Sequence, residues 1–146
     1  MPPNLSLRPA TADDLERLAE MNRQLIEDEK SANLMDVERL RERMRRWLET
    51  DYRAVLFMQD EVIGYALYRF EDETFRERRV VYARQFFVER AYRRRGLGRE
   101  AFSQLRETYF EKAHVRLEVL TANPDGSAFW ESLGFEPYAV TMGLEP

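Results

Sequence analysis

The sequence predicts an α/β (α+β) fold, in which helices cover both faces of a mixed, mostly antiparallel central sheet. Apolar runs with strand-like and helical spacing follow one another in the order β-α-α-β-β-β-α-β-α-β. The middle strands are joined by short turns that suit hairpins, and a strand-loop-helix-strand unit follows them. A length of 146 residues suits one domain spanning residues 1–146.

The N-terminal part is expected to hold one strand and two helices. A short strand is expected at residues 5–7. Thr11 and Asp14 suit the N-terminal cap of a helix whose apolar positions run to Leu25. Asp36 can cap a second helix, which carries an apolar stripe on one side.

The remaining elements form a hairpin and then alternate between strands and helices. Pro124 suits the first turn of the last helix, and Gly134 suits its C-terminal end. The sequence predicts strands at residues 53–58, 62–70, 80–88, 115–120 and 138–142, and helices at residues 99–112 and from residue 124.

Composition excludes several kinds of function. The net charge of −4 argues against a general nucleic-acid binder. With no cysteine and one histidine, neither a thiolate nucleophile nor a zinc site is expected, and we expect no metal. The sequence shows no signal-peptide pattern and no apolar run of membrane-spanning length, so we expect a cytoplasmic protein without a membrane partner.

The segment Arg93-Arg94-Arg95-Gly96-Leu97-Gly98 is the most informative part of the chain. It lies between a predicted strand and a predicted helix, where glycines allow a tight turn that exposes backbone amides. The free N–H groups of a helix start attract anions, and arginine side chains add positive charge. The segment therefore predicts a phosphate or pyrophosphate site, whereas a solvated arginine-rich turn is the simpler alternative.

The same segment resembles the R/Q-x-x-G-x-G/A acetyl-CoA loop of the GNAT superfamily of N-acetyltransferases. Arg93, Gly96 and Gly98 occupy its defining positions. Further along, Leu117-Glu118-Val119, Asn123 and the run from Ala128 to Phe135 resemble the family's later motifs in order and spacing. The resemblance covers roughly residues 80 to 138.

This resemblance implies the GNAT fold with splayed fourth and fifth strands, and acetyl-CoA as co-substrate. The expected reaction is direct attack of a primary amine on the thioester within a ternary complex. The backbone of Phe86-Phe87-Val88 would pair with the pantetheine arm. The residues expected at the cofactor are Phe86, Phe87, Val88, Arg93, Arg94, Arg95, Gly96, Leu97, Gly98, Arg99, Asn123 and Trp130.

Catalytic roles are also implied by the resemblance. Glu118 corresponds to a glutamate that serves as general base in some relatives. Trp130 stands where many relatives have a tyrosine acid, and an indole cannot donate that proton. Ser127, one helical turn earlier, is a candidate acid, and Tyr138 is another. A solvated or ion-paired Glu118 and core packing of Trp130 are the simpler alternatives.

Two further assignments each have a structural alternative. Asn123 would contact the cofactor or cap the following helix. Asp28 and Glu29 lie in an acidic run that would attract a cationic amine acceptor, or would simply be solvated.

Two other functions compete with the acetyltransferase hypothesis. One is a non-catalytic regulatory module that binds CoA, which Trp130 favours. The other is a dinucleotide-binding domain, because residues 96–101 match G-x-G-x-x-A. The sequence identifies neither the amine acceptor, a small molecule or a peptide, nor the oligomeric state, for which a homodimer is one possibility.

Overall fold

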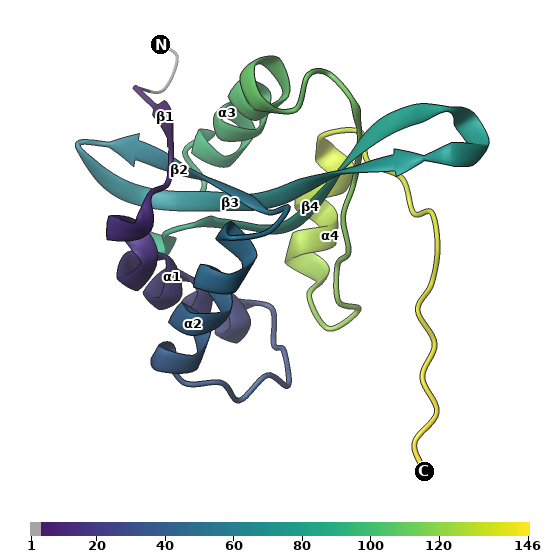
Figure 1. The fold of residues 1–146 in the computed structure, drawn as a ribbon, viewed down its shortest axis with the longest axis horizontal. Coiled ribbons are helices and arrows are strands. Elements are labelled where there is room, and N and C mark those ends of the chain that lie inside the picture. Colours follow the sequence, from purple (N-terminus) through teal and green to yellow (C-terminus); the bar gives the residue numbers. More distant parts are fainter. Residues whose placement is uncertain (1–3) are drawn as a thin grey trace.

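The computed structural model describes residues 4–146, so residues 1–3 of the predicted domain lie outside the described part. Its five-stranded sheet has the order β1-β2-β3-β4-β5 (Figure 1). Neighbouring strands are antiparallel from β1 to β4, and β5 is parallel to β4. The mixed, mostly antiparallel sheet is thus confirmed. The strands are β1 (Ser6–Pro9), β2 (Arg53–Gln59), β3 (Glu61–Glu73), β4 (Arg78–Val88) and β5 (His114–Arg116).

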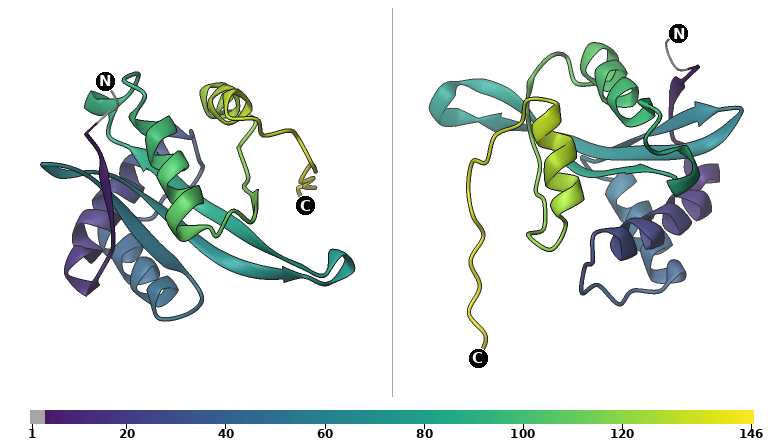
Figure 2. Two further views of the ribbon diagram at one scale, coloured as in Figure 1. Left: turned by 90° about the horizontal axis from the view of Figure 1, so that it is seen from above. Right: turned by 180° about the vertical axis from the view of Figure 1, so that it is seen from behind.

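Helices cover both faces of the sheet, as predicted. Helices α1 (Leu15–Asp28) and α2 (Val37–Leu48) lie on one face, and α3 (Leu97–Gln104) and α4 (Pro124–Ser132) on the other (Figures 1 and 2). Shorter helical turns are η1 (Ala12–Asp14), η2 (Thr74–Arg76), η3 (Arg90–Tyr92) and the π-helical η4 (Leu105–Tyr109).

Both predicted N-terminal caps are present. An Asp36 carboxylate oxygen accepts a hydrogen bond from the Arg39 backbone N–H at 2.8 Å, which fixes the start of α2. Asp14 accepts from the Thr11 N–H, also at 2.8 Å, at the start of η1, which leads into α1. Local sequence therefore sets where these helices begin.

A separate apolar core fills each side of the sheet. Phe57, Tyr68, Val81 and Phe102 are buried between the sheet and α3. Leu18, Leu56, Tyr65 and Phe87 are buried between the sheet and α1 and α2. The sheet is thus packed on both of its faces.

A β-bulge in β4 changes which side chains face each core. Leu67 of β3 lies opposite Gln85, whereas its neighbour Tyr68 lies opposite Ala83, so Arg84 has no partner across the ladder. A bulge of this kind bends the strand and re-aims the residues beyond it.

The predicted splay of the fourth and fifth strands is confirmed. Residues 80–82 of β4 pair with residues 114–116 of β5, and the pairing stops there. The C-terminal part of β4, residues 83–88, is left without a neighbouring strand on the β5 side. On that side, the backbone of residues 83–88 therefore pairs with no strand.

The structure differs from the sequence prediction at three places. Strand β5 ends at Arg116 instead of Leu120, because β4 has already diverged. The helix expected at residues 99–112 begins at Leu97 and ends in the π-helical η4. The prediction of a strand at residues 138–142 is wrong, because this segment pairs with no strand of the described chain.

Candidate functional site

The loop between β4 and α3 presents backbone N–H groups at a helix start. Arg94 (φ 62°) and Gly96 (φ 79°) have left-handed backbone conformations, and α3 begins at the next residue. The first helical hydrogen bond runs from the Glu100 N–H to the Gly96 carbonyl, at 3.0 Å. Among residues 4–146, no protein acceptor outside α3 binds the N–H groups of residues 94–99. Such a concave set of donors is suited to an anion.

The loop arginines take different positions. Arg94 and Arg95 are exposed beside the free N–H groups. Arg93 instead turns toward the sheet, where its Nε donates to the Val88 carbonyl at 2.6 Å. Arg99 donates to the Ser132 carbonyl at 3.2 Å and so connects α3 with the end of α4.

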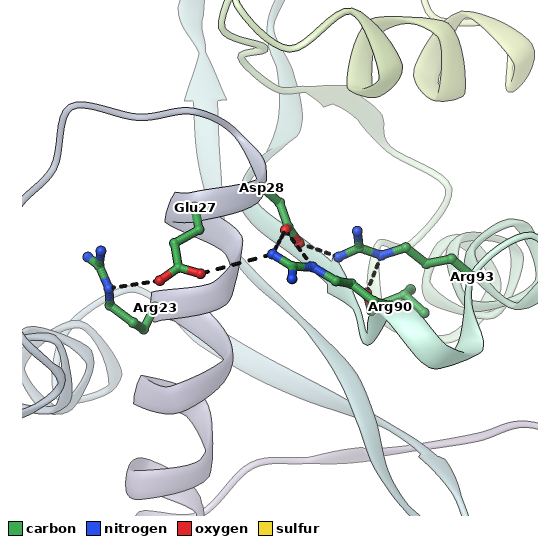
Figure 3. A network of polar contacts seen from close by, with 6 residues as sticks. Arg23, Glu27, Asp28, Arg90 and Arg93 are labelled. Carbon is green, nitrogen blue, oxygen red and sulfur yellow. Dashed lines mark hydrogen bonds and ion pairs between the residues drawn. The ribbon is translucent and has the colours of Figure 1, made fainter.

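Asp28 ties the end of α1 to this loop (Figure 3). Its side chain is 16% exposed, and its carboxylate pairs with Arg90 at 2.6 Å and with Arg93. Glu27, beside it, lies farther from its partners, at 3.6 Å from Arg23 and 4.0 Å from Arg90. Asp28, which was expected to attract the amine acceptor of the acetyl group, thus has two arginine partners in this structure.

Glu29 is the second residue that was expected to attract the amine acceptor. Burial, followed by the negative charge of Asp28, raises the pKa of the Glu29 carboxyl above its usual range. The two carboxylates therefore differ, since Asp28 is paired with arginines and the pKa of Glu29 is raised by burial.

The side chains of the splayed part of β4 belong to both cores. Phe86 packs with Phe129 and Trp130 on the α4 side, whereas Phe87 is buried toward α1 and α2. Val88 is buried in the core between the sheet and α3. These side chains are therefore used in packing, whereas the backbone edge of residues 83–88 toward β5 pairs with no strand of the described chain.

Trp130 lies within a cluster of aromatic rings. Its ring centroid is 5.0 Å from Phe86, 5.6 Å from Phe102, 4.8 Å from Phe129 and 5.2 Å from Phe135, in edge-to-face arrangements. The packing alternative for Trp130 is thereby supported.

Gly98 also contributes to this packing. A Cβ atom at Gly98 would lie 3.2 Å from the Phe129 ring, so the glycine lets α4 approach the start of α3. Leu97, beside it, is buried in the same core.

Glu118 has a partner that sequence reasoning missed. The Tyr82 hydroxyl donates to the Glu118 carboxylate at 2.9 Å, on the α1 and α2 side of the sheet. Burial and this hydrogen bond raise the pKa of Tyr82 to about 12, so it stays protonated at neutral pH. Only the pairing of residues 82 and 116 across β4 and β5 places Tyr82 there, and no sequence motif indicates it.

Of the remaining predicted site residues, Asn123 and Ser127 lie at the N-terminal part of α4, and Tyr138 lies away from the site. Asn123 accepts a hydrogen bond from the Gly126 N–H at 3.1 Å, so the capping alternative is present. Ser127 is half-buried on α4. Tyr138, the other candidate acid, is exposed on the C-terminal segment and is not brought to this site.

The dinucleotide hypothesis does not fit this geometry. Its fingerprint requires the first glycine at the end of a strand in a parallel βαβ unit. Residues 89–95, including η3, separate the end of β4 from Gly96. Among the described strands, only β4 and β5 are parallel neighbours.

Comparison with known proteins identifies the class that this fold and site define. The model of the Acetyltransferase (GNAT) family matches residues 19–135. The chain therefore belongs to the GNAT acetyltransferase family and is an enzyme of that family. No match was found among curated proteins.

Solved structures confirm the fold at low sequence identity. A possible acetyltransferase from Clostridium difficile 630 is 22% identical, with 97% of both chains covered and a TM-score of 0.80. A predicted acetyltransferase from Clostridium acetobutylicum, crystallised with acetyl-CoA, is 17% identical, with 97% and 96% covered and a TM-score of 0.75. An aminoglycoside acetyltransferase from an uncultured soil metagenomic sample, in complex with sisomicin, is 16% identical, with 97% and 96% covered and a TM-score of 0.72.

In the part of the chain that the structure describes, no helix is both long and apolar enough to span a bilayer.

Proposed function

We propose that this protein transfers the acetyl group of acetyl-CoA to a primary amine by direct attack within a ternary complex. The observation that carries the proposal is the row of free N–H groups at residues 94–99, next to the splayed edge of β4. The chain's membership of the acetyltransferase family supports the reaction class. A structure of similar fold contains acetyl-CoA, which agrees with this choice of acyl donor.

The loop would bind the pyrophosphate of the coenzyme. Its N–H groups, the partial positive charge of the α3 N-terminus, and the exposed Arg94 and Arg95 all favour an anion. Arg93 would act indirectly, because its guanidinium already binds Val88 and Asp28. Its role is to hold the loop against the sheet.

The edge of β4 would bind the pantetheine arm by adding an extended chain to the sheet. Residues 83–88 offer this edge because β5 has diverged. The aromatic cluster of Phe86, Phe129 and Trp130 would supply apolar contact next to it. The backbone N–H groups of β4 would stabilise the negative charge that develops on the thioester oxygen.

The chemical step needs a neutral amine. The amine nitrogen attacks the acetyl carbon, a C–N bond forms, and the C–S bond breaks to release CoA as a thiolate. Glu118 would accept the proton that the amine loses, directly or through water. The thiolate of a group with pKa near 8.5 leaves without a protein acid, so the tryptophan at position 130 does not prevent transfer.

A cationic amine is the acceptor class that the α1 side favours. Asp28 and Glu29 lie at the end of α1 next to the loop, and an aminoglycoside acetyltransferase of similar fold was crystallised in complex with sisomicin. Acceptors are therefore best screened among amines, with release of free CoA thiol as the readout.

A glycine substitution tests coenzyme binding. Gly96→Val places a branched side chain where φ is 79°, although the space around the Cβ is open. A left-handed residue costs about 1–2 kcal/mol, so the binding-competent loop becomes less populated. We expect CoA affinity, measured by calorimetry, to fall roughly 5- to 30-fold.

Gly134→Val is the matched control. Gly134 also has a positive φ of 99° and open space, but it lies after α4 and outside the loop. It should lose comparable stability and keep CoA affinity. Unchanged CoA affinity in folded Gly96→Val would contradict the assignment of the loop.

A further inference from the structure

Two arginines without a counter-charge meet on one tryptophan, on the side of the sheet that α1 and α2 cover (Figure 1). The guanidinium carbon of Arg43, in α2, lies 4.4 Å from the Trp47 ring centroid, and that of Arg84, in β4, lies 4.7 Å from it. Within residues 4–146, no carboxylate oxygen lies within 4.0 Å of either guanidinium. Like charges that are held close together attract an anion from solution.

Arg43 is half-buried and has unused hydrogen-bond donors. Its Nη2 donates to the Asn22 Oδ1 at 3.2 Å, which is its only hydrogen bond within the described chain. The Arg43 Nε is buried without an acceptor, and so is the amide nitrogen of Asn22, whose side chain is fully buried. Native proteins rarely leave buried donors unpaired, because these groups have lost their hydrogen bonds to water. This cluster therefore offers more donors than the chain has acceptors for.

Arg84 reaches the same place because it occupies the bulge of β4. It has no partner across the ladder to β3, and a bulge re-aims the side chains around it. Its Nη1 donates to the Tyr52 hydroxyl at 3.1 Å, and the side chain is exposed, so its other donors remain available. Burial, and after it the charge of Arg84, lowers the pKa of Arg43, which agrees with repulsion between the two groups. Both stay positively charged at neutral pH.

The arginine pair lies beside the residues that the proposed reaction would use. The guanidinium carbon of Arg69 lies 5.1 Å from the Tyr52 ring centroid and 5.4 Å from that of Tyr82. The Tyr52 hydroxyl accepts from Arg84, whereas the Tyr82 hydroxyl donates to Glu118. Both tyrosines pack on the same face of the sheet, and Tyr82 and Arg84 are two residues apart in β4. The arginine pair and Glu118 are therefore neighbours on this face.

We propose that the amine acceptor also carries an oxyanion, a carboxylate or a phosphate, which Arg43 and Arg84 bind while the amine faces Glu118. The inference rests on the acetyl transfer proposed above and narrows its acceptor to small molecules that bear both groups. A guanidinium offers paired N–H donors that match two oxygens of such an anion. The Trp47 ring holds both cations before the anion arrives, so little side-chain freedom is lost on binding.

Matched acceptors test the oxyanion directly. β-Alanine and propylamine have equal numbers of carbon atoms and differ by a carboxylate in place of a methyl group. Phosphoethanolamine and ethanolamine differ by the phosphate. In at least one pair, the charged member should have a kcat/KM about 10- to 100-fold higher than its neutral counterpart, and the larger ratio identifies the anion. Equal values within both pairs would overturn the oxyanion site and leave acetyl transfer itself intact.

Variants of the arginines show whether the preference comes from this cluster. Arg84→Gln and Arg43→Gln should each remove most of the ratio, by raising KM for the charged acceptor while the neutral acceptor is nearly unaffected. Arg79→Gln is the matched control and should keep the ratio. Arg79 is also an arginine of β4, 3.8 Å from the Phe70 ring centroid, but Glu111 neutralises it at 3.1 Å. Equal losses for charged and neutral acceptors would show a purely structural role and contradict the proposal.

Binding separates a failure of this site from a failure of the proposed reaction. If no amine is acetylated, the reaction is wrong, and calorimetric titration of β-alanine and phosphoethanolamine into the protein, with and without CoA, still tests the oxyanion site. Binding that Arg84→Gln weakens about 10-fold or more, and that Arg79→Gln leaves unchanged, would support the site. Absence of binding for both compounds, or equal binding to all variants, would overturn it.

Discussion

At the scale of single residues, the proposed site would separate groups that contact substrate from groups that hold other residues in place. Glu118 is exposed and bound to one neutral donor, the Tyr82 hydroxyl, so its carboxylate keeps free acceptor positions. Arg93 and Asp28 form an ion pair, which in the proposed site would leave the phosphate contacts to backbone N–H groups and to Arg94 and Arg95. Residue type alone does not show this division of roles.

Glu118→Gln tests the base directly. The amide keeps the size of the side chain and still accepts from Tyr82, but it cannot take a proton from the amine. We expect kcat/KM to fall about 10²-fold or more at neutral pH, as for other general bases. The deficit should shrink at high pH, where more of the amine is already neutral. Thiol-release assays from pH 7 to 10 measure this.

A nearby carboxylate provides the control for that experiment. Glu131→Gln removes an exposed charge from α4 without touching the Tyr82 pair and should leave the pH profile unchanged. A loss of the same size at every pH in Glu118→Gln would show that the glutamate only holds structure.

Trp130 should act through packing. Trp130→Phe leaves an aromatic ring among Phe86, Phe102 and Phe129, so it should keep most activity and lose about 1–3 kcal/mol of stability. Thermal unfolding and steady-state rates measure the two effects separately.

Trp130→Tyr distinguishes packing from a missing acid. A phenol at this position would restore the proton donor that many relatives have. If proton delivery limited the rate, activity would rise about 10²-fold. We expect no such gain, and its appearance would refute the packing role.

At the scale of elements, the sequence predicts most of the fold because local patterns decide it. The caps at Thr11 and Asp36 and the hairpin of β2 and β3 depend on neighbouring residues and match the structure. The loop at residues 93–98 is likewise recognisable from its glycines and from the helix that follows.

Long-range pairing decides the elements that the sequence did not predict. Strict alternation would place Tyr82 and Phe86 on the same face of β4. The bulge at Arg84 separates them, so Tyr82 faces α1 and α2 while Phe86 faces α4. Strand β5 is short because β4 bends away from it, and residues 138–142 lack a neighbour within the chain despite their strand-like sequence.

The contact between α1 and the loop yields a prediction whose sign is informative. Asp28→Asn removes the charge that holds Arg90 and Arg93. If Asp28 positions the loop, CoA should bind about 3- to 10-fold more weakly, in line with roughly 1 kcal/mol for such a pair. If charge alone mattered, removing a carboxylate near an anion site would tighten binding. Calorimetry at low salt decides between the two.

The adjacent glutamate serves as a matched control for Asp28. Glu27→Gln removes a charge from the same turn of α1, but its nearest arginine contacts are 3.6 and 4.0 Å. It should leave CoA affinity within about twofold, because weak exposed pairs contribute little. Equal effects of both substitutions would show that Asp28 has no special role.

At the scale of the whole molecule, distant parts of the chain meet where β4 ends. The end of α1, the loop before α3 and the C-terminal end of α4 are joined there by Asp28, Arg93 and the Arg99–Ser132 hydrogen bond. A coenzyme bound along β4 would contact segments that are otherwise held by few bonds. Binding should therefore stabilise the whole fold and not only the loop.

Hydrogen exchange with and without CoA tests this coupling. Ligand at 100 times its Kd adds about 2.7 kcal/mol of stability, which corresponds to a rise in Tm of roughly 5–11 °C for a chain of this size. Exchange should slow most at residues 83–88 and 94–99, whose N–H groups become bonded, and least at residues 74–77, at the far tip of the β3–β4 hairpin. Protection spread evenly over the chain, without a maximum at β4 and the loop, would show that CoA binds elsewhere.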